Sequence, residues 1–229
     1  MSSARPSRDD GPGPVRLVIF DCDGVLVDSE PIANRVFAEM LEAHGLPMTV
    51  EEVIDTFVGR SRDTCVAMAG EMRGAALPEG FAQAWDRTFH EAMRRELRAV
   101  PGVPELLAGL KVPFCVASNG EPAQMEVSLT ITGIMPLVKG RIFSAAQVAR
   151  PKPAPDLFLH AARTMGDVAP ADCVVIEDTP TGVRAAIDAG MRVFAYAGGK
   201  HTNRAEVSRL GATVFDDMRE LPRLLEGAA

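Results

Sequence analysis

The spacing of apolar residues divides this chain into a strand, a long helical stretch and an alternation of strands and helices. Residues 15–20 are almost all apolar and mostly β-branched or aromatic, which predicts a strand buried on both faces. Apolar residues then recur at helical spacing, and helices are predicted at 32–41, 50–57, 63–72 and 81–93. No strand is predicted between Ser29 and Val100, so these residues are expected to form a separate helical block.

From Pro104 onward, short apolar runs alternate with helical patterns. Strands are predicted at 114–117, 142–143, 173–176, 193–196 and 213–215. Helices are predicted at 122–130, 156–165, 181–189, 203–210 and 218–225. Such alternation is typical of βαβ units, which build a parallel sheet with helices on both faces. With the opening strand included, the predicted fold class is α/β, with a doubly wound, Rossmann-like core and an inserted helical domain.

Domain boundaries follow from these changes of pattern. The prolines and glycine at 101–104 predict a hinge or linker that closes the helical block. Residues 1–14 contain no apolar run and no amphipathic pattern, and they are expected to be a disordered tail. We therefore predict an α/β core from residues 15–28 and 100–229, and a helical cap from residues 29–99.

Composition and charge narrow the function classes. The chain has 229 residues, of which 47% are hydrophobic, so it is long enough to bury a full core. Its net charge of −7 disfavours nucleic acid or an anionic membrane as a partner, because phosphate backbones are bound by clustered Lys and Arg. The four cysteines show no CxxC spacing, which favours free buried thiols in a reducing cytoplasm. No stretch reaches transmembrane length, and a monomer or small homo-oligomer is expected.

Polar residues gather where three of the predicted strands end. In open parallel sheets, ligands bind outside the carboxyl ends of the strands. The candidates are Asp21 and Asp23 after the first strand, Ser118, Asn119 and Gly120 after the second, and Glu177 and Asp178 after the fourth. Lys152 lies between prolines, which would stiffen its loop and fix the direction of its ammonium group. Each residue alone could be a helix cap or a solvated loop residue, but chance is a poor explanation for all of them together.

The charges of these residues indicate phosphoryl transfer with a bound cation. The four acids would repel one another unless a cation lay among them, and all-oxygen ligands favour Mg²⁺ over zinc. The first acid, Asp21, could attack phosphorus, while Asp23 gives a proton to the leaving group and later takes one from water. The oxygens of the phosphoryl group would be held by the hydroxyl of Ser118 and by the backbone N–H groups around Gly120.

Four stretches, in this order, resemble the successive motifs of the haloacid dehalogenase superfamily. They are DCDGVLVDSE at 21–30, VASNG at 116–120, RPKPAPDLF at 150–158 and VIEDTPTGVRAA at 175–186. The chain is similar to the β-phosphoglucomutase-like and phosphoglycolate phosphatase-like group, in which a helical cap follows the first motif. The resemblance covers nearly everything from Val15 to about Leu221.

This resemblance implies a role for each acid. Asp21 would be the nucleophile, and Asp23 the acid/base whose backbone carbonyl also meets the metal. Glu177 and Asp178 would lie on the metal side, so the implied Mg²⁺ site comprises all four acids. The turn at 24–29 would couple movement of the cap to the site.

The resemblance also implies the groups that bind the substrate. The phosphoryl group would be bound and neutralised by Ser118, Asn119 and Lys152. In the cap, Arg60 and Ser61 are expected to reach the substrate, although a charged loop at a helix entry is the plain alternative.

The predicted function is a Mg²⁺-dependent phosphatase that hydrolyses a small phosphorylated metabolite, favoured as a sugar phosphate, through an aspartyl-phosphate intermediate. Dehalogenases and phosphonatases of the superfamily lack the second aspartate, so Asp23 favours phosphate esters. The alternative is a sugar phosphomutase of the same superfamily. Those mutases carry a histidine at the position that Ala33 occupies here, so the phosphatase is favoured over the mutase. A phospho-aspartate signalling switch is a remote alternative, because receiver domains carry no cap.

Two further groups of polar residues are interpreted as structural. Asp216 and Asp217 precede the last predicted helix and are expected to cap it. The histidines show no ligand spacing and are expected to be surface or helix-end residues: His44, His90, His160 and His201.

Overall fold

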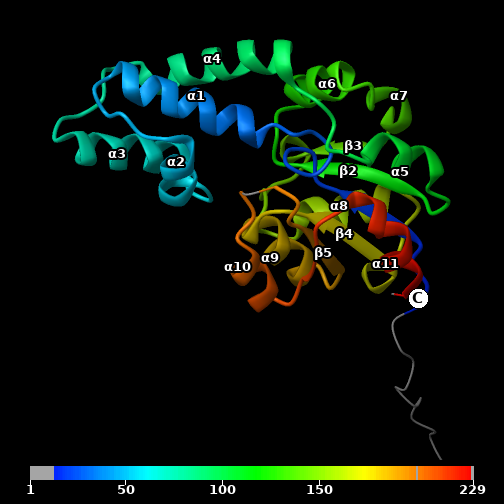
Figure 1. The fold of residues 1–229 in the computed structure, drawn as a ribbon. Helices are drawn as coiled ribbons and strands as arrows, with labels where there is room; N and C mark the ends of the chain where they lie inside the picture. Colours follow the sequence, from blue (N-terminus) through cyan, green and yellow to red (C-terminus); the bar gives the residue numbers. More distant parts are fainter. Residues whose placement is uncertain (1–12, 200, 228–229) are drawn as a thin grey trace, which may run out of the picture.

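The computed structural model describes residues 13–199 and 201–227, and its centre is a parallel sheet of six strands (Figure 1). The strands are β1 (Leu17–Phe20), β2 (Phe114–Ser118), β3 (Ile142–Ser144), β4 (Cys173–Glu177), β5 (Arg192–Tyr196) and β6 (Thr213–Phe215). Their order is β3-β2-β1-β4-β5-β6, so the sheet extends in both directions from β1. This order confirms the predicted doubly wound α/β fold. Apart from residues 13 and 14, the predicted tail lies outside the described residues.

Alternate residues of β1 face two different layers of helices. Val18 and Phe20 share a hydrophobic cluster with helices α5 (Val103–Gly109), α6 (Pro122–Ile131), α7 (Met135–Val138) and α11 (Leu221–Gly227). Leu17 and Ile19 share another with helices α8 (Asp156–Thr164), α9 (Pro180–Asp188) and α10 (Arg204–Arg209). Short 3-10 helices lie at Ala145–Gln147, Pro170–Asp172 and Met218–Glu220. Because β1 is apolar throughout, it can lie between both layers as the central strand.

Four helices form a lobe beside the sheet, which we call the cap (Figure 1). They are α1 (Glu30–Ala43), α2 (Val50–Phe57), α3 (Arg62–Arg73) and α4 (Phe81–Glu96). The cap has its own cluster of buried apolar residues, in which Phe37 stacks on Trp85 with ring centres 3.9 Å apart. The α2 helix begins at a capping box, in which Thr49 and Glu52 satisfy each other's backbone amides. The helix-only pattern of these residues is therefore confirmed.

The chain enters and leaves the cap at neighbouring points. Val27 and Ala99 form an antiparallel bridge, and the amide of Val100 donates to the carbonyl of Leu26 at 3.0 Å. The two connecting segments therefore support each other beside the end of β1, where the sequence predicted a hinge.

Two helices of the core were not predicted. The segment expected to be only a linker contains the start of α5, because Pro104 occupies its first turn, where a missing N–H costs nothing. The short helix α7 lies in a stretch with too few residues for a helical period to show. Within the described residues, no helix is both long enough and apolar enough to cross a bilayer.

Candidate active site

Asp21 and Asp23 follow the central strand of the sheet. β1 pairs with β2 on one side and β4 on the other, and the Asp21 amide continues the ladder by donating to the Ile176 carbonyl at 2.9 Å. Asp21 is only 8% exposed, whereas Asp23 is partly exposed where it lines a cleft. Gly24 follows with a φ of +76°, a conformation that favours glycine. Both acids therefore lie at the middle of the sheet's carboxyl edge.

Lys152 brings a buried ammonium group to these acids. Its Nζ atom lies 2.6 Å from Asp21 Oδ1 and 2.7 Å from Glu177 Oε1, and its side chain is 3% exposed. The same atom stands 4.6 Å from the centre of the Phe158 ring, which belongs to α8. The alternative of a solvated loop cation is therefore wrong.

Asn119 clamps the backbone of Lys152. Its Nδ2 donates to the Lys152 carbonyl at 3.0 Å, and the Lys152 amide donates to its Oδ1, also at 3.0 Å. Helix α6 begins at Pro122 without any side-chain cap, so neither Ser118 nor Asn119 caps it. The paired amide bonds instead join the loop after β2 to the loop that carries Lys152.

Ser118 ends β2 with a hydroxyl group in the cleft. Its Oγ accepts a hydrogen bond from the Gly120 amide at 3.1 Å, and it is 4% exposed. The Gly120 carbonyl in turn accepts from the Ser144 hydroxyl at 2.8 Å, which fixes this loop to β3. Because Ser118 accepts from the loop, its own proton is available to donate to a ligand oxygen.

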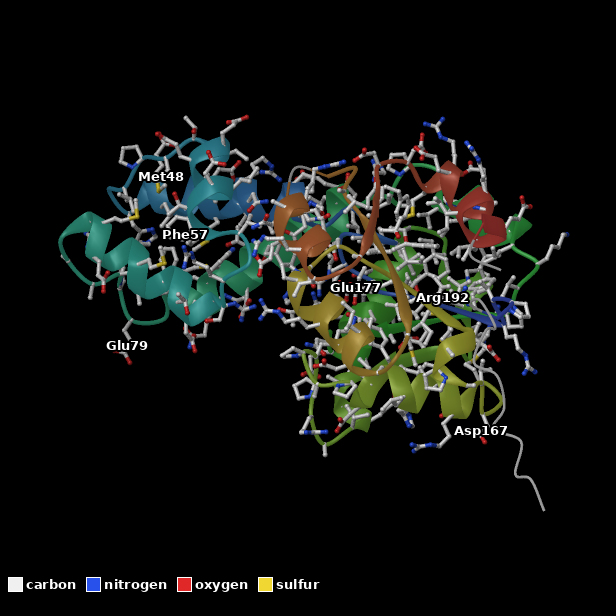
Figure 2. The ribbon with its side chains drawn as sticks, turned by 90° about the horizontal axis from the view of Figure 1, so that it is seen from below. Met48, Phe57, Glu79, Asp167, Glu177 and Arg192 are labelled. Atoms are coloured by element: carbon white, nitrogen blue, oxygen red, sulfur yellow. The ribbon has the colours of Figure 1, made fainter. Side chains whose placement is uncertain are left out.

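Glu177 accepts hydrogen bonds on both carboxylate oxygens. Lys152 donates to Oε1, while Oε2 accepts from the amides of Asp178 and Thr179 at 3.0 Å and from the Thr179 hydroxyl at 2.9 Å. Glu177 is 1% exposed, and Figure 2 shows it inside the core, away from Phe57 of the cap. The N-cap residue of helix α9 is Thr179, so the alternative that Glu177 caps this helix is wrong.

Asp178 keeps one carboxylate oxygen without a partner. Asp178 is 2% exposed, and its buried Oδ1 has no hydrogen-bond partner among the described residues. Its Oδ2 lies 2.9 Å from Nε2 of His201, whose side chain is 7% exposed. The expectation that His201 is a surface or helix-end residue is therefore wrong, because its loop folds back from β5 onto the site.

Burial and neighbouring charges shift the pKa values of the site. Burial raises the pKa values of Asp21 and Asp178, and Glu177 raises both further, while Lys152 opposes the shift. Burial alone would lower the pKa of Lys152, but attraction to Asp21 and Glu177 outweighs it and raises that pKa. A dication among these acids would favour their ionised forms.

The donors fit a hard cation such as Mg²⁺. A buried carboxylate oxygen without a partner is costly, and Oδ1 of Asp178 is such an atom. Within residues 13–199 and 201–227, no group of three or more His, Cys, Asp or Glu side chains is arranged to hold a metal ion by itself. Mg²⁺ usually binds through one or two carboxylates and keeps several waters, and the unpartnered Oδ1 of Asp178 can supply one such oxygen.

A cleft of about 760 Å³ contains these residues and extends to the cap. Arg60, in the loop between α2 and α3, lines it and donates from Nε to the Thr56 carbonyl at 2.9 Å. Ser61 does not line the cleft; it is the N-cap of α3 and accepts from the Thr64 amide at 3.2 Å. The cleft brings together the other predicted site residues: Asp21, Asp23, Arg60, Ser118, Asn119, Gly120, Lys152, Glu177 and Asp178.

Sequence reasoning missed two residues that contact the site acids, Thr179 and His201. Thr179 resembles an ordinary helix cap, which it also is. His201 follows β5, and the rule that ligands bind at carboxyl strand ends would have pointed to this loop had it been applied to that strand. Of the two acids expected to be caps, Asp217 does accept from the backbone of a 3-10 helix, but Asp216 pairs with Arg204 instead.

Similarity to known proteins agrees with this geometry. Residues 15–190 match the haloacid dehalogenase-like hydrolase family. The chain is 31% identical over 211 residues to the 6-phosphogluconate phosphatase of Escherichia coli K12, covering 92% of this chain and 94% of that protein. It is 35% identical over 185 residues to hexitol phosphatase A of the same organism, covering 77% of this chain and 81% of that protein.

A solved structure extends the similarity to three dimensions. A HAD family hydrolase from Deinococcus radiodurans, with bound phosphate and sodium, has a TM-score of 0.85 at 34% identity, covering 96% of this chain and 97% of that one. Family, relatives and fold lead to the same assignment. This chain belongs to the haloacid dehalogenase-like hydrolases and is one of their phosphatases, which act on phosphoric monoesters.

Proposed function

We propose that this protein is a Mg²⁺-dependent phosphatase that hydrolyses a small sugar phosphate through an aspartyl-phosphate intermediate. The observation that carries the proposal is the contact of 2.6 Å between Lys152 Nζ and Asp21 Oδ1. The ammonium group orients the carboxylate through one oxygen, and no described residue hydrogen-bonds the other, Oδ2. That second oxygen is therefore available for attack on phosphorus.

The two acids after β1 take separate roles in this reaction. A carboxylate oxygen of Asp21 forms a bond to phosphorus as the bond from phosphorus to the substrate oxygen breaks, and Asp23 gives that oxygen a proton. Asp23 then takes a proton from water as the water oxygen bonds to phosphorus. The bond between phosphorus and Asp21 breaks, which releases inorganic phosphate and restores both acids. Ala33 stands where the phosphomutases carry a histidine, which supports water as the acceptor.

Mg²⁺ would be held by Asp21, Asp178 and the backbone carbonyl of Asp23. HAD-family hydrolases typically use this cation. When bound, it supplies charge neutralisation to the phosphoryl group. Both oxygens of Glu177 already accept hydrogen bonds, so we assign it the task of holding Lys152.

The wall of the cleft supports a hydroxyl-rich substrate. Beyond the acids, the core side of the cleft carries polar side chains that include Thr181, Arg184, Asn203 and Glu206. Such groups can donate to or accept from several hydroxyls, as recognition of a sugar requires. The relatives named 6-phosphogluconate phosphatase and hexitol phosphatase A support the same substrate class.

The test is phosphate release from a panel of hexose, hexitol and sugar-acid phosphates, with Mg²⁺ and with EDTA. We expect turnover that needs Mg²⁺ and falls to background in Asp21→Asn. Asp216→Asn is the matched control, because Asp216 also follows a strand but pairs with Arg204 outside the cleft. Undiminished turnover in Asp21→Asn, or no turnover of the panel by the parent protein, would refute the proposal.

A further inference from the structure

We propose that His201 is a positioning residue for Asp178: its imidazole N–H holds Oδ2, so that Oδ1 stays directed to the cation. The inference rests on the proposed Mg²⁺-dependent function. It assigns a task to a histidine that lies outside the four motif stretches of the sequence. The pairing of the two side chains, the close packing around them and the anchoring of Thr202 support it.

The first observation is the pairing of the two side chains. Nε2 of His201 lies 2.9 Å from Oδ2 of Asp178, and their side chains are 7% and 2% exposed. Water therefore does not compete for this contact. The other oxygen, Oδ1, is buried with no partner among the described residues. Oδ2 is thus anchored by His201, while Oδ1 remains available to a cation. Metal-binding side chains are commonly oriented by an outer hydrogen-bond partner in this way.

The second observation is the close packing around the pair. A Cβ atom placed on Gly24 would lie 2.2 Å from Asp178 Oδ2 and 3.0 Å from His201 Nε2. A Cβ atom on Gly199 would lie 2.3 Å from His201 Cε1. Any side chain at either position would displace the pair. The chain therefore has glycine on both sides of the contact, one from the loop after β1 and one from the loop after β5.

The third observation is how the histidine loop is held. The hydroxyl of Thr202, which is itself buried, donates to the carbonyl of Tyr196 at 3.0 Å. Tyr196 is the last residue of β5, so the bond folds the loop back over the strand it leaves. Thr202, the residue next to His201, is therefore anchored to the end of β5. Because Asp178 directly follows β4, its contact with His201 joins two neighbouring strand ends.

The consequence concerns the orientation of the carboxylate. Without a partner on Oδ2, Asp178 could rotate and turn both oxygens away from the position that serves the cation. Loss of such an outer contact typically lowers metal affinity by about 10- to 100-fold. The effect should fall on Mg²⁺ binding itself, whatever substrate is present.

Two substitutions of similar size separate the hydrogen bond from packing. His201→Gln keeps an N–H donor near the position of Nε2, whereas His201→Met fills the space with no donor. His160→Gln is a control, because His160 packs against Phe143 and does not line the cleft. Mg²⁺ binding to the full-length protein, stripped with EDTA, is measured by titration calorimetry, and the rise of the melting temperature with Mg²⁺ gives a second measure.

We expect His201→Met to weaken Mg²⁺ binding by about tenfold or more, while His201→Gln and His160→Gln stay close to the parent protein. Equal Mg²⁺ affinity in the folded Met and Gln variants would overturn the inference, as would a parent protein that binds no Mg²⁺. If His201→Met does not fold, a loss of affinity in Gly199→Ala, whose new Cβ would lie 2.3 Å from His201 Cε1 and displace the imidazole, supports the inference, and parent-like affinity overturns it. Phosphate release by the parent protein tests the proposed function separately, so the two failures are distinguishable.

Discussion

The ammonium nitrogen of Lys152 lies 2.6 Å from Asp21 Oδ1, although 131 positions separate the two residues. The same nitrogen lies 2.7 Å from Glu177 Oε1, so one cation stands between acids from two adjacent strands. The backbone carbonyl and the backbone N–H of Lys152 are both hydrogen-bonded to the side-chain amide of Asn119. The position of the Asp21 carboxylate therefore depends on a loop that is distant in sequence.

Removal of this cation should affect stability as well as activity. Lys152→Met leaves the buried carboxylates of Asp21 and Glu177 facing each other, and breaking a buried ion pair in this way costs about 3–5 kcal/mol. We expect a fall of that size in the free energy of unfolding, measured by urea denaturation without Mg²⁺, and loss of phosphate release. Lys111→Met, at an exposed position, is the control and should change neither quantity. Parent-like stability of Lys152→Met would contradict the role of the ion pair.

Gly182 offers a test of how tightly Glu177 is held. In a helix, Gly→Ala normally stabilises by about 0.5–1 kcal/mol. At Gly182, however, the new Cβ would lie 1.7 Å from Glu177 Oε1, and that carboxylate is fixed by its hydrogen bonds. We therefore expect Gly182→Ala to destabilise the protein by about 1–3 kcal/mol, as overpacking does, and to lower activity.

The control for this change is Gly70→Ala, within helix α3. The nearest atom to its new Cβ would be 3.4 Å away, an ordinary contact. In thermal and urea unfolding, Gly70→Ala should therefore raise the free energy of unfolding, whereas Gly182→Ala should lower it. If Gly182→Ala is as stable as the parent protein, Glu177 is less firmly fixed than its contacts imply.

Two arginines separated by one residue should differ in their effect on substrate binding. Arg60 lines the cleft, whereas Arg62 pairs with Asp86 at 2.6 Å outside it. We expect Arg60→Ala to raise KM for a sugar phosphate by about tenfold, which corresponds to one charge-assisted hydrogen bond, with little change in kcat. Arg62→Ala should leave KM unchanged. Steady-state kinetics of both variants decide the question, and equal KM values would remove Arg60 from the binding site.

The sequence predicted the parts of the site that depend on strand ends. Asp21, Ser118 and Asp178 each follow a recognisable apolar run, and the parallel sheet necessarily brings those ends together. The contacts between loops were less accessible. Nothing local in the sequence shows that Asn119 would clamp the Lys152 loop, because that contact depends on how two long connections pack.

The missed elements have local causes. Helix α5 was hidden because Pro104 is a breaker in most contexts but is tolerated in a first turn. His201 was missed because the four histidines show no ligand spacing in the sequence, and the pair of glycines before it is a pattern typical of exposed turns. In both cases the surrounding structure, which the local pattern does not contain, decides between two permitted conformations.

Asp23 is expected to give the proton to the leaving group. Burial raises the pKa of Asp23, against a hydrogen bond from Ser29 that lowers it, so the protonated acid persists to higher pH than in an exposed aspartate. For a sugar phosphate, kcat/KM should therefore fall as pH rises through this raised pKa, because the alkoxide leaving group needs the proton. p-Nitrophenyl phosphate has a leaving group that departs without a proton, so its kcat/KM should fall much less. Asp23→Asn should likewise lower kcat/KM by about 10²- to 10⁴-fold for the sugar phosphate and by less for p-nitrophenyl phosphate. An equal loss for both substrates would show that Asp23 acts through the structure of the site and does not supply the proton.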